Sequence, residues 1–99
     1  MRFEPTFLVT ATFAADAAER RTPYRAAHLD HVASLLADGT ALVVGARADL
    51  AASVLVLRAV DAADARARVE RDPYWQHRVW TAIDVVEYLA ATPQSLGRS

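Results

Sequence analysis

Apolar and polar residues alternate near the start of the chain, and this period of two predicts a β-strand rather than a helix. The strand is expected from Phe7 to Phe13. Its apolar face carries Phe7, Val9, Ala11 and Phe13. The chain therefore begins with a strand.

A helix is expected after a short polar stretch. Thr22 can serve as its N-cap, and Pro23 suits the first turn because its fixed backbone angle matches a helix start. The helix runs to about Asp38, where Gly39 stops it.

One arc of this helix is apolar, yet it includes two ionisable side chains. At about 100° per residue, Arg25 and His28 fall inside the arc, and His31 lies at its margin. The rest of the arc consists of Leu29, Val32, Leu35 and Leu36. A helix that faces a core seldom places ionisable groups there, so Arg25 and His28 become candidates for a functional site.

The second half of the chain predicts three more strands and a second helix. Strands are expected over residues 41–45 and 53–60, joined as a hairpin. Asp61 can cap a helix over residues 62–71, and Asp72 can cap a further turn that begins at Pro73. The last strand runs from Val79 to about Tyr88, with Trp80 and Tyr88 on the face opposite Val79, Ile83 and Val85.

The order strand, helix, strand, strand, helix, strand is that of the α+β ferredoxin-like βαββαβ fold. It predicts a four-stranded antiparallel sheet with two helices on one face. The other face keeps apolar residues that so short a chain cannot cover, so we expect a homodimer that packs sheet against sheet. Residues 1–99 are expected to form one domain, ordered over about residues 5–90, with a polar and mobile tail over residues 92–99.

Composition narrows the possible functions. A hydrophobic share of 54% with 23% charged residues is typical of a folded globular protein. The net charge of −1 leaves no extended positive field, so nucleic acid is not expected as a partner. The first 13 residues resemble neither a signal peptide nor a membrane span, which predicts a cytoplasmic protein without membrane contact. The absence of cysteine excludes disulfides and thiol nucleophiles.

His28 is the leading candidate for chemistry, because an imidazole with a pKa of about 6.5 exchanges protons near neutral pH without a cofactor. Its alternative role is that of a core histidine bonded to backbone or to Tyr24. Arg25 keeps its charge when buried, so it either marks a polar cavity or extends along the helix to solvent. Asp72 either caps the turn at Pro73 or orients a neighbouring imidazole.

Other kinds of site find little support. His28, His31 and His77 lack the spacing and the carboxylates of a metal site, so no metal is expected. No serine lies in a nucleophile turn, and no glycine-rich loop could hold a phosphate.

These features resemble the YciI-like (YCII-related) family of small dimeric α+β barrel proteins, from Phe7 to about Tyr88. The matching elements are Arg25-Ala26-Ala27-His28-Leu29, Asp38-Gly39 before the second strand, Gly45 at its end, and Asp72-Pro73-Tyr74. The resemblance implies a ferredoxin-like dimer with a pocket in which His28 and Asp72 form an acid–base pair. Two positions depart from the family pattern: Ala46 replaces a proline, and Arg78 stands where a glycine often precedes the last strand.

The family also includes members that resemble dehydrochlorinases of hydroxylated aromatics, with relatives among muconolactone isomerases and cofactor-free monooxygenases. Our first hypothesis is therefore a cofactor-independent lyase or isomerase that acts on a small cyclic, aromatic or polyketide-like molecule by elimination, dehydration, cyclisation or isomerisation, in a setting such as secondary metabolism. His28 would move the proton, Asp72 would orient the imidazole, and Arg25 would hold a substrate oxygen. The residues expected to bind substrate are Arg25, Tyr24, Tyr74 and Trp75. The alternatives are a non-catalytic small-molecule-binding or accessory protein and a cofactor-free monooxygenase.

Overall fold

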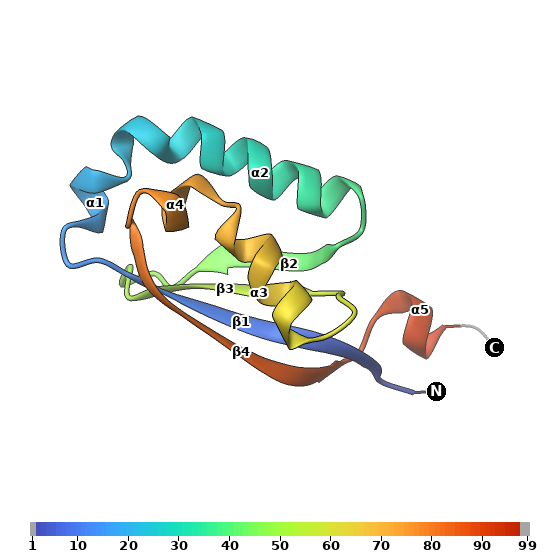
Figure 1. Ribbon diagram of the computed structural model, residues 1–99. Helices are drawn as coiled ribbons and strands as arrows, with labels where there is room; N and C mark the ends of the chain where they lie inside the picture. Colours follow the sequence, from blue (N-terminus) through green and yellow to red (C-terminus); the bar gives the residue numbers. More distant parts are fainter. Residues whose placement is uncertain (1, 98–99) are drawn as a thin grey trace.

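The computed structural model describes residues 2–97, which form one antiparallel sheet with helices packed on one face (Figure 1). The strands are β1 (Glu4–Phe13), β2 (Ala41–Ala46), β3 (Ala52–Leu57) and β4 (Trp80–Ala90). Their order in the sheet is β2-β3-β1-β4, and every neighbouring pair is antiparallel. The predicted ferredoxin-like α+β fold is confirmed.

Two longer helices and several short ones complete the fold. They are α1 (Ala17–Arg20), the 3-10 turn η1 (Thr22–Tyr24), α2 (Arg25–Ala37), α3 (Ala62–Glu70), α4 (Pro73–Gln76) and α5 (Pro93–Leu96). α2 and α3 lie over the same face of the sheet, and α4 connects α3 to the start of β4 (Figure 1).

Most helix and strand ends lie where the neighbouring residues predict them. Gly39 has a φ of 80°, a left-handed conformation that ends α2 as predicted. The Asp61 carboxylate accepts a hydrogen bond from the Asp64 backbone and caps α3. The prediction that Thr22 caps the long helix is wrong, because Thr22 lies inside η1 and no side chain caps α2. β3 ends at Leu57, before the predicted Val60, since the backbone of Val60 already bonds to Asp64.

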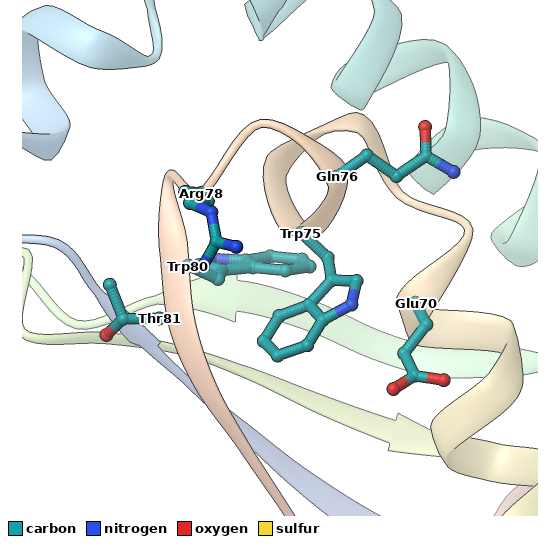
Figure 2. A pocket seen from close by; sticks show the side chains of 6 residues that line it. All are labelled: Glu70, Trp75, Gln76, Arg78, Trp80 and Thr81. Atoms are coloured by element: carbon teal, nitrogen blue, oxygen red, sulfur yellow. The ribbon is translucent and has the colours of Figure 1, made fainter.

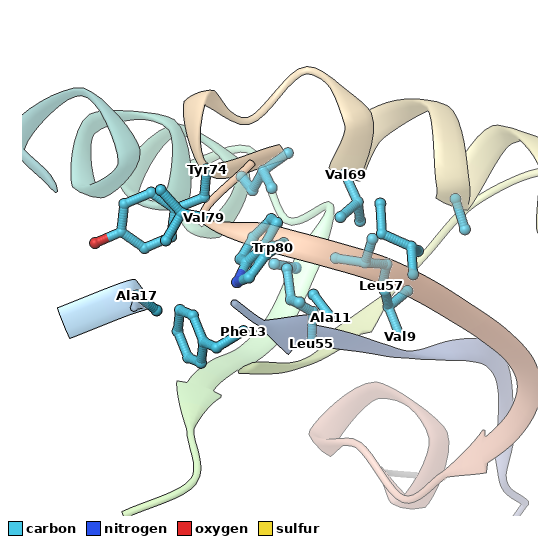
Figure 3. Packing of buried hydrophobic residues seen from close by; sticks show 14 residues of the cluster. Val9, Ala11, Phe13, Ala17, Leu55, Leu57, Val69, Tyr74, Val79 and Trp80 are labelled. Atoms are coloured by element: carbon cyan, nitrogen blue, oxygen red, sulfur yellow. The ribbon is translucent and has the colours of Figure 1, made fainter. Parts of the chain in front are cut away.

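The core lies between the sheet and the helices. Direct strand partners point to the same side, so residues paired across the sheet form continuous rows. One such row is Val44, Leu55, Val9 and Val85, which faces the helices. Val9, Leu55 and Leu57 are among the largest fully buried side chains, and they meet Val69 of α3 (Figure 3).

The prediction that Trp80 lies opposite Ile83 is wrong. Thr12 pairs with Ala82, but Phe13 pairs with Trp80, so β4 carries one extra residue at this point. A bulge of one residue reverses the side-chain alternation beyond it. Trp80 therefore points into the core on the same side as Ile83, and it is 1% exposed (Figure 3).

Arg78 precedes this bulge in an unusual conformation. Its φ of 59° is in the left-handed region, which glycine adopts at lower cost than arginine. This is the position at which the family resemblance predicts a glycine. The turn from α4 into β4 therefore keeps a glycine-like backbone without a glycine.

A short helix, α5, lies in the segment for which the sequence predicts a mobile tail. The Thr92 and Ser95 side chains bond to each other's backbone in a capping box. The Thr92 hydroxyl also donates to Glu4, and Arg58 donates to both Glu4 and Gln94. These bonds attach the segment to the end of β1, while residues 98 and 99 lie outside the described part of the chain.

The face of the sheet without helices carries an apolar row. Val43 pairs with Val56, Val56 with Leu8, and Leu8 with Val86, so four aliphatic side chains cross all four strands. Val86 and Tyr88 are exposed on this face, as is Val43. The segment around α5 covers one end of this face, where Thr6 is 1% exposed, and the chain leaves the rest of the apolar row uncovered.

Candidate active site

His28 and Asp72 form a buried pair beneath the N-terminal half of α2. The Nδ1 atom of His28 lies 2.9 Å from Oδ1 and 2.8 Å from Oδ2 of Asp72. His28 is 9% exposed and Asp72 is 1% exposed. A carboxylate only accepts hydrogen bonds, so Nδ1 carries the hydrogen and, in the neutral ring, Nε2 carries the free lone pair. The pair thus selects the tautomer in which Nε2 can act as a base.

The Asp72 carboxylate is held by the helix that it caps. Its Oδ1 atom accepts a hydrogen bond of 2.8 Å from the backbone of Tyr74, and Pro73 occupies the first turn of α4. The two roles considered for Asp72, helix cap and imidazole partner, therefore coexist. The cap fixes the carboxylate in the orientation that receives His28.

Aromatic rings hold the imidazole in place. The Tyr74 ring stacks on His28 with 3.7 Å between centroids and an angle of 4°, and Trp80 meets His28 edge-on at 5.6 Å. The indole Nε1 of Trp80 donates to the hydroxyl of Ser53 at 3.2 Å. His28 is thus restricted on two sides and through Nδ1.

The Nε2 atom of His28 faces a cavity of about 190 Å³. Among the described residues, every fully buried side-chain nitrogen and oxygen has a hydrogen-bond partner. The Nε2 atom of His28 has no partner there, so it is not fully buried and a ligand can reach it. The apolar walls of this cavity come from α2, β1 and β2. Its lining residues are Phe13, Arg21, Arg25, His28, Leu29, Val32, Val44, Gly45, Ala46, Ser53 and Tyr74.

Two arginines give the cavity a positive end. Arg25 lines the cavity and is also exposed overall. It therefore both marks a polar cavity and reaches solvent, the two roles considered for it. Arg21, which lies between α1 and η1, lines the cavity as well. Burial raises the pKa of the Tyr74 hydroxyl, and the positive charges of Arg21 and Arg25 partly oppose this rise. Tyr74 therefore stays protonated near neutral pH and can donate a hydrogen bond.

Two residues expected to bind substrate lie elsewhere. Tyr24 stacks on His77 at 3.9 Å between ring centroids, and it does not line the cavity. Trp75 lines a separate hollow of about 390 Å³ (Figure 2). The other residues of that hollow are Glu70, Gln76, Arg78, Trp80 and Thr81. The structure thus brings together His28, Asp72, Arg25 and Tyr74 of the predicted set.

Sequence reasoning missed Arg21 and Ser53. Arg21 precedes the expected N-cap Thr22, so the helical periodicity that indicated Arg25 did not extend to it. Ser53 alternates with Leu55 and Leu57, which places its hydroxyl on the buried face of β3. The signal for Ser53 was present, but a polar residue at the edge of an apolar pattern does not by itself indicate a site.

The remaining histidine of α2 has a structural contact rather than a metal-binding one. His31, expected at an exposed margin, is half-buried and its Nε2 lies 3.3 Å from the carbonyl oxygen of Arg68. Between residues 2 and 97, no three His, Asp or Glu side chains gather closely enough to hold a metal ion. Over the same residues, no helix has the length and hydrophobicity needed to cross a bilayer.

Comparison with known proteins agrees with this architecture. In fold, the chain is similar to a 5-chloro-2-hydroxyhydroquinone dehydrochlorinase from Burkholderia phenoliruptrix, solved in complex with 2,5-dihydroxybenzoquinone. The TM-score is 0.72 at 22% sequence identity, covering 84% of this chain and 92% of that chain. No curated protein matches the sequence significantly. The family model for the YCII-related domain matches residues 6–89, which extend from β1 to β4 and include both His28 and Asp72, so the chain belongs to the YCII-related domain family.

Proposed function

We propose that this protein is a cofactor-independent acid–base enzyme, a lyase or isomerase that acts on a small hydroxylated ring. The observation that carries the proposal is the buried His28–Asp72 pair, whose free Nε2 faces a cavity with two arginines. Buried acid–base groups that have a specific charge partner and open into a cavity are typical of catalytic sites.

His28 is the group that moves the proton. Its Nε2 removes a proton from a substrate carbon or hydroxyl, and the imidazolium that forms is stabilised by the adjacent Asp72 carboxylate. In an elimination, the electron pair released by the substrate forms a double bond, and the leaving group departs with its own bonding pair. In an isomerisation, His28 returns the proton to another atom of the substrate. Neither route requires electrons from outside the substrate.

Arg25 is the group that stabilises negative charge on the substrate. Neither Arg25 nor Arg21 has a carboxylate partner among residues 2–97, so both guanidiniums are available to a ligand. Planar donors of this kind stabilise an oxygen whose charge grows as the proton leaves. Tyr74 is assigned to substrate contact because it lines the cavity, and Trp75 is left out because it does not.

Elimination is the reaction that we favour. The dehydrochlorinase that shares this fold releases chloride from a hydroxylated ring, as its name states. A base at Nε2 and a positive end of the cavity are the two features that such an elimination requires. This similarity supports the reaction class and not a particular substrate.

The test follows chloride release from 5-chloro-2-hydroxyhydroquinone, and deuterium exchange into 2,5-dihydroxybenzoquinone by proton NMR. The wild type should accelerate at least one of these reactions, and His28→Gln should lose about 100-fold or more of that acceleration. His77→Gln is the matched control, because His77 is exposed and lies outside the cavity. Full activity in His28→Gln would refute the assignment of the base. Binding of the quinone without either reaction would favour the small-molecule-binding alternative, and oxygen uptake would favour a monooxygenase.

We also propose a homodimer that packs sheet against sheet. The apolar row of Val43, Val56, Leu8 and Val86 crosses the uncovered face, and burying such surface contributes about 25 cal/mol per Å². A second copy would bring an identical row to the same surface, which is the self-complementary arrangement of a two-fold dimer.

A further inference from the structure

The hydroxyl of Ser53 is a second polar group inside the cavity. Ser53 is 4% exposed, and it lines the same cavity as His28. Its oxygen accepts the Trp80 Nε1 hydrogen at 3.2 Å. No acceptor among residues 2–97 receives the hydrogen that the hydroxyl itself carries.

The bond from Trp80 decides where this hydrogen can point. An indole N–H only donates, so it occupies a lone pair of the Ser53 oxygen and cannot accept from it. A buried hydroxyl needs a partner for its hydrogen as well, because an unsatisfied donor costs free energy. Since the described part of the protein offers no acceptor and Ser53 borders the cavity, the hydrogen is available to a molecule bound there.

We propose that Ser53 is a substrate-binding residue that donates a hydrogen bond to an anionic ring oxygen, and that Trp80 positions it. This inference rests on the proposed function, and it names the class of substrate for the same site. Ser53, Tyr74, Arg21 and Arg25 all present donors to the cavity, whereas His28 presents the lone pair of Nε2. Such a set suits a ligand with several negative or electron-rich oxygens and one proton to lose.

The size of the cavity suits a single ring. A cavity of about 150 Å³ accommodates benzene, and this cavity measures about 190 Å³. A single six-membered ring with hydroxyl or carbonyl substituents therefore fits, with its oxygens directed at the donors. The ligand class is a monocyclic enolate, phenolate or hydroxyquinone anion.

The experiment measures the dissociation constant of 2,5-dihydroxybenzoquinone by equilibrium dialysis, using the absorbance of the quinone. Ser53→Ala should weaken binding about tenfold or more, as expected when a hydrogen bond to a charged oxygen is lost. Trp80→Phe removes the positioning bond but keeps the hydroxyl, so it should weaken binding by about threefold, less than Ser53→Ala does. Ser34→Ala is the control for loss of a hydroxyl, because Ser34 is exposed on α2 and bonds to the His31 carbonyl.

Three results would overturn the inference. They are binding by Ser53→Ala within about twofold of the wild type, a larger loss in Trp80→Phe than in Ser53→Ala, and no binding of the quinone by the wild type. Turnover tests the proposed function separately. Loss of quinone binding in Ser53→Ala, together with no reaction in the wild type, would support the binding role of Ser53 and refute the proposed enzymatic activity. Loss of turnover in His28→Gln with unchanged binding in Ser53→Ala would support the proposed enzymatic activity and refute the binding role of Ser53.

Discussion

The Nδ1 atom of His28 lies within 2.9 Å of both carboxylate oxygens of Asp72, although the two residues are 44 positions apart in the chain. The same carboxylate accepts the backbone hydrogen of Tyr74 at the start of α4. The Asp72 side chain therefore both caps α4 and orients the imidazole of His28. Its substitution can separate these roles.

Asp72→Asn should keep the cap and lose the charge. Asparagine caps helices about as well as aspartate, so the loss of stability should stay near or below about 1 kcal/mol, whereas Asp72→Ala should cost more. Activity should fall about 100-fold or more in both variants, because the imidazolium loses its charged partner. Urea unfolding and chloride release measure the two effects. Full activity in a folded Asp72→Asn variant would mean that the carboxylate serves the helix alone.

Arg25→Gln should weaken binding of 2,5-dihydroxybenzoquinone about tenfold, since a charged donor to the ring oxygens is removed. Salt should weaken binding by the wild type more than by the variant, because salt screens the guanidinium. Arg20→Gln is the matched control: Arg20 pairs with Asp16 on the surface of α1, outside the cavity. Equal affinities of Arg25→Gln and wild type would remove Arg25 from the site.

Val86→Glu should dissociate the proposed dimer. Val86 is 45% exposed and lies in the apolar row, so a dimer would bury the introduced carboxylate without a partner. Dimerisation should weaken about 100-fold or more, as measured by sedimentation velocity. Val60→Glu provides the comparison, because Val60 is 89% exposed and lies outside the sheet. A wild type that sediments as a monomer at every concentration would contradict the dimer.

Glu4→Gln should reduce the sensitivity of the fold to acid. The hydrogen bond from Arg58 lowers the pKa of Glu4 below its ordinary value of 4.5, and Thr92 adds to this effect against the opposing influence of burial. A lowered folded-state pKa contributes stability that is present above the unfolded value and is lost as the pH falls through the folded value. The wild type should therefore exceed Glu4→Gln by about 1 kcal/mol at pH 7, and the difference should shrink below about pH 4.5.

Urea unfolding between pH 3 and pH 7 provides the measurement, with about 1 kcal/mol as the scale of the effect. Glu87→Gln is the control, because Glu87 is exposed and makes no ion pair within residues 2–97. A difference between the wild type and Glu4→Gln that stays constant over this range would show that the carboxylate charge contributes nothing.

Much of the architecture could be predicted because its signals are local. Alternation over Phe7–Phe13 indicated β1, Gly39 ended α2, and Asp61 capped α3, since each depends on neighbouring residues alone. The order of these elements then predicted the ferredoxin-like sheet. His28 was expected on a buried face for the same reason, because helical periodicity places it beside apolar residues.

The sequence by itself determined the four strands, the helices α2 and α3 and their order, and it singled out His28 and Asp72 as candidates for an acid–base pair. It did not predict α1 or α5. Only the tertiary structure decided that His28 meets Asp72, because that contact depends on how α2 and α4 pack over the sheet. It also turned Trp80 inward, since one extra residue in β4 reverses an alternation that the sequence alone shows as regular. Trp80 in turn bonds to Ser53, so this shift of one residue in strand pairing brings the indole to a hydroxyl that β3 already directs toward the cavity.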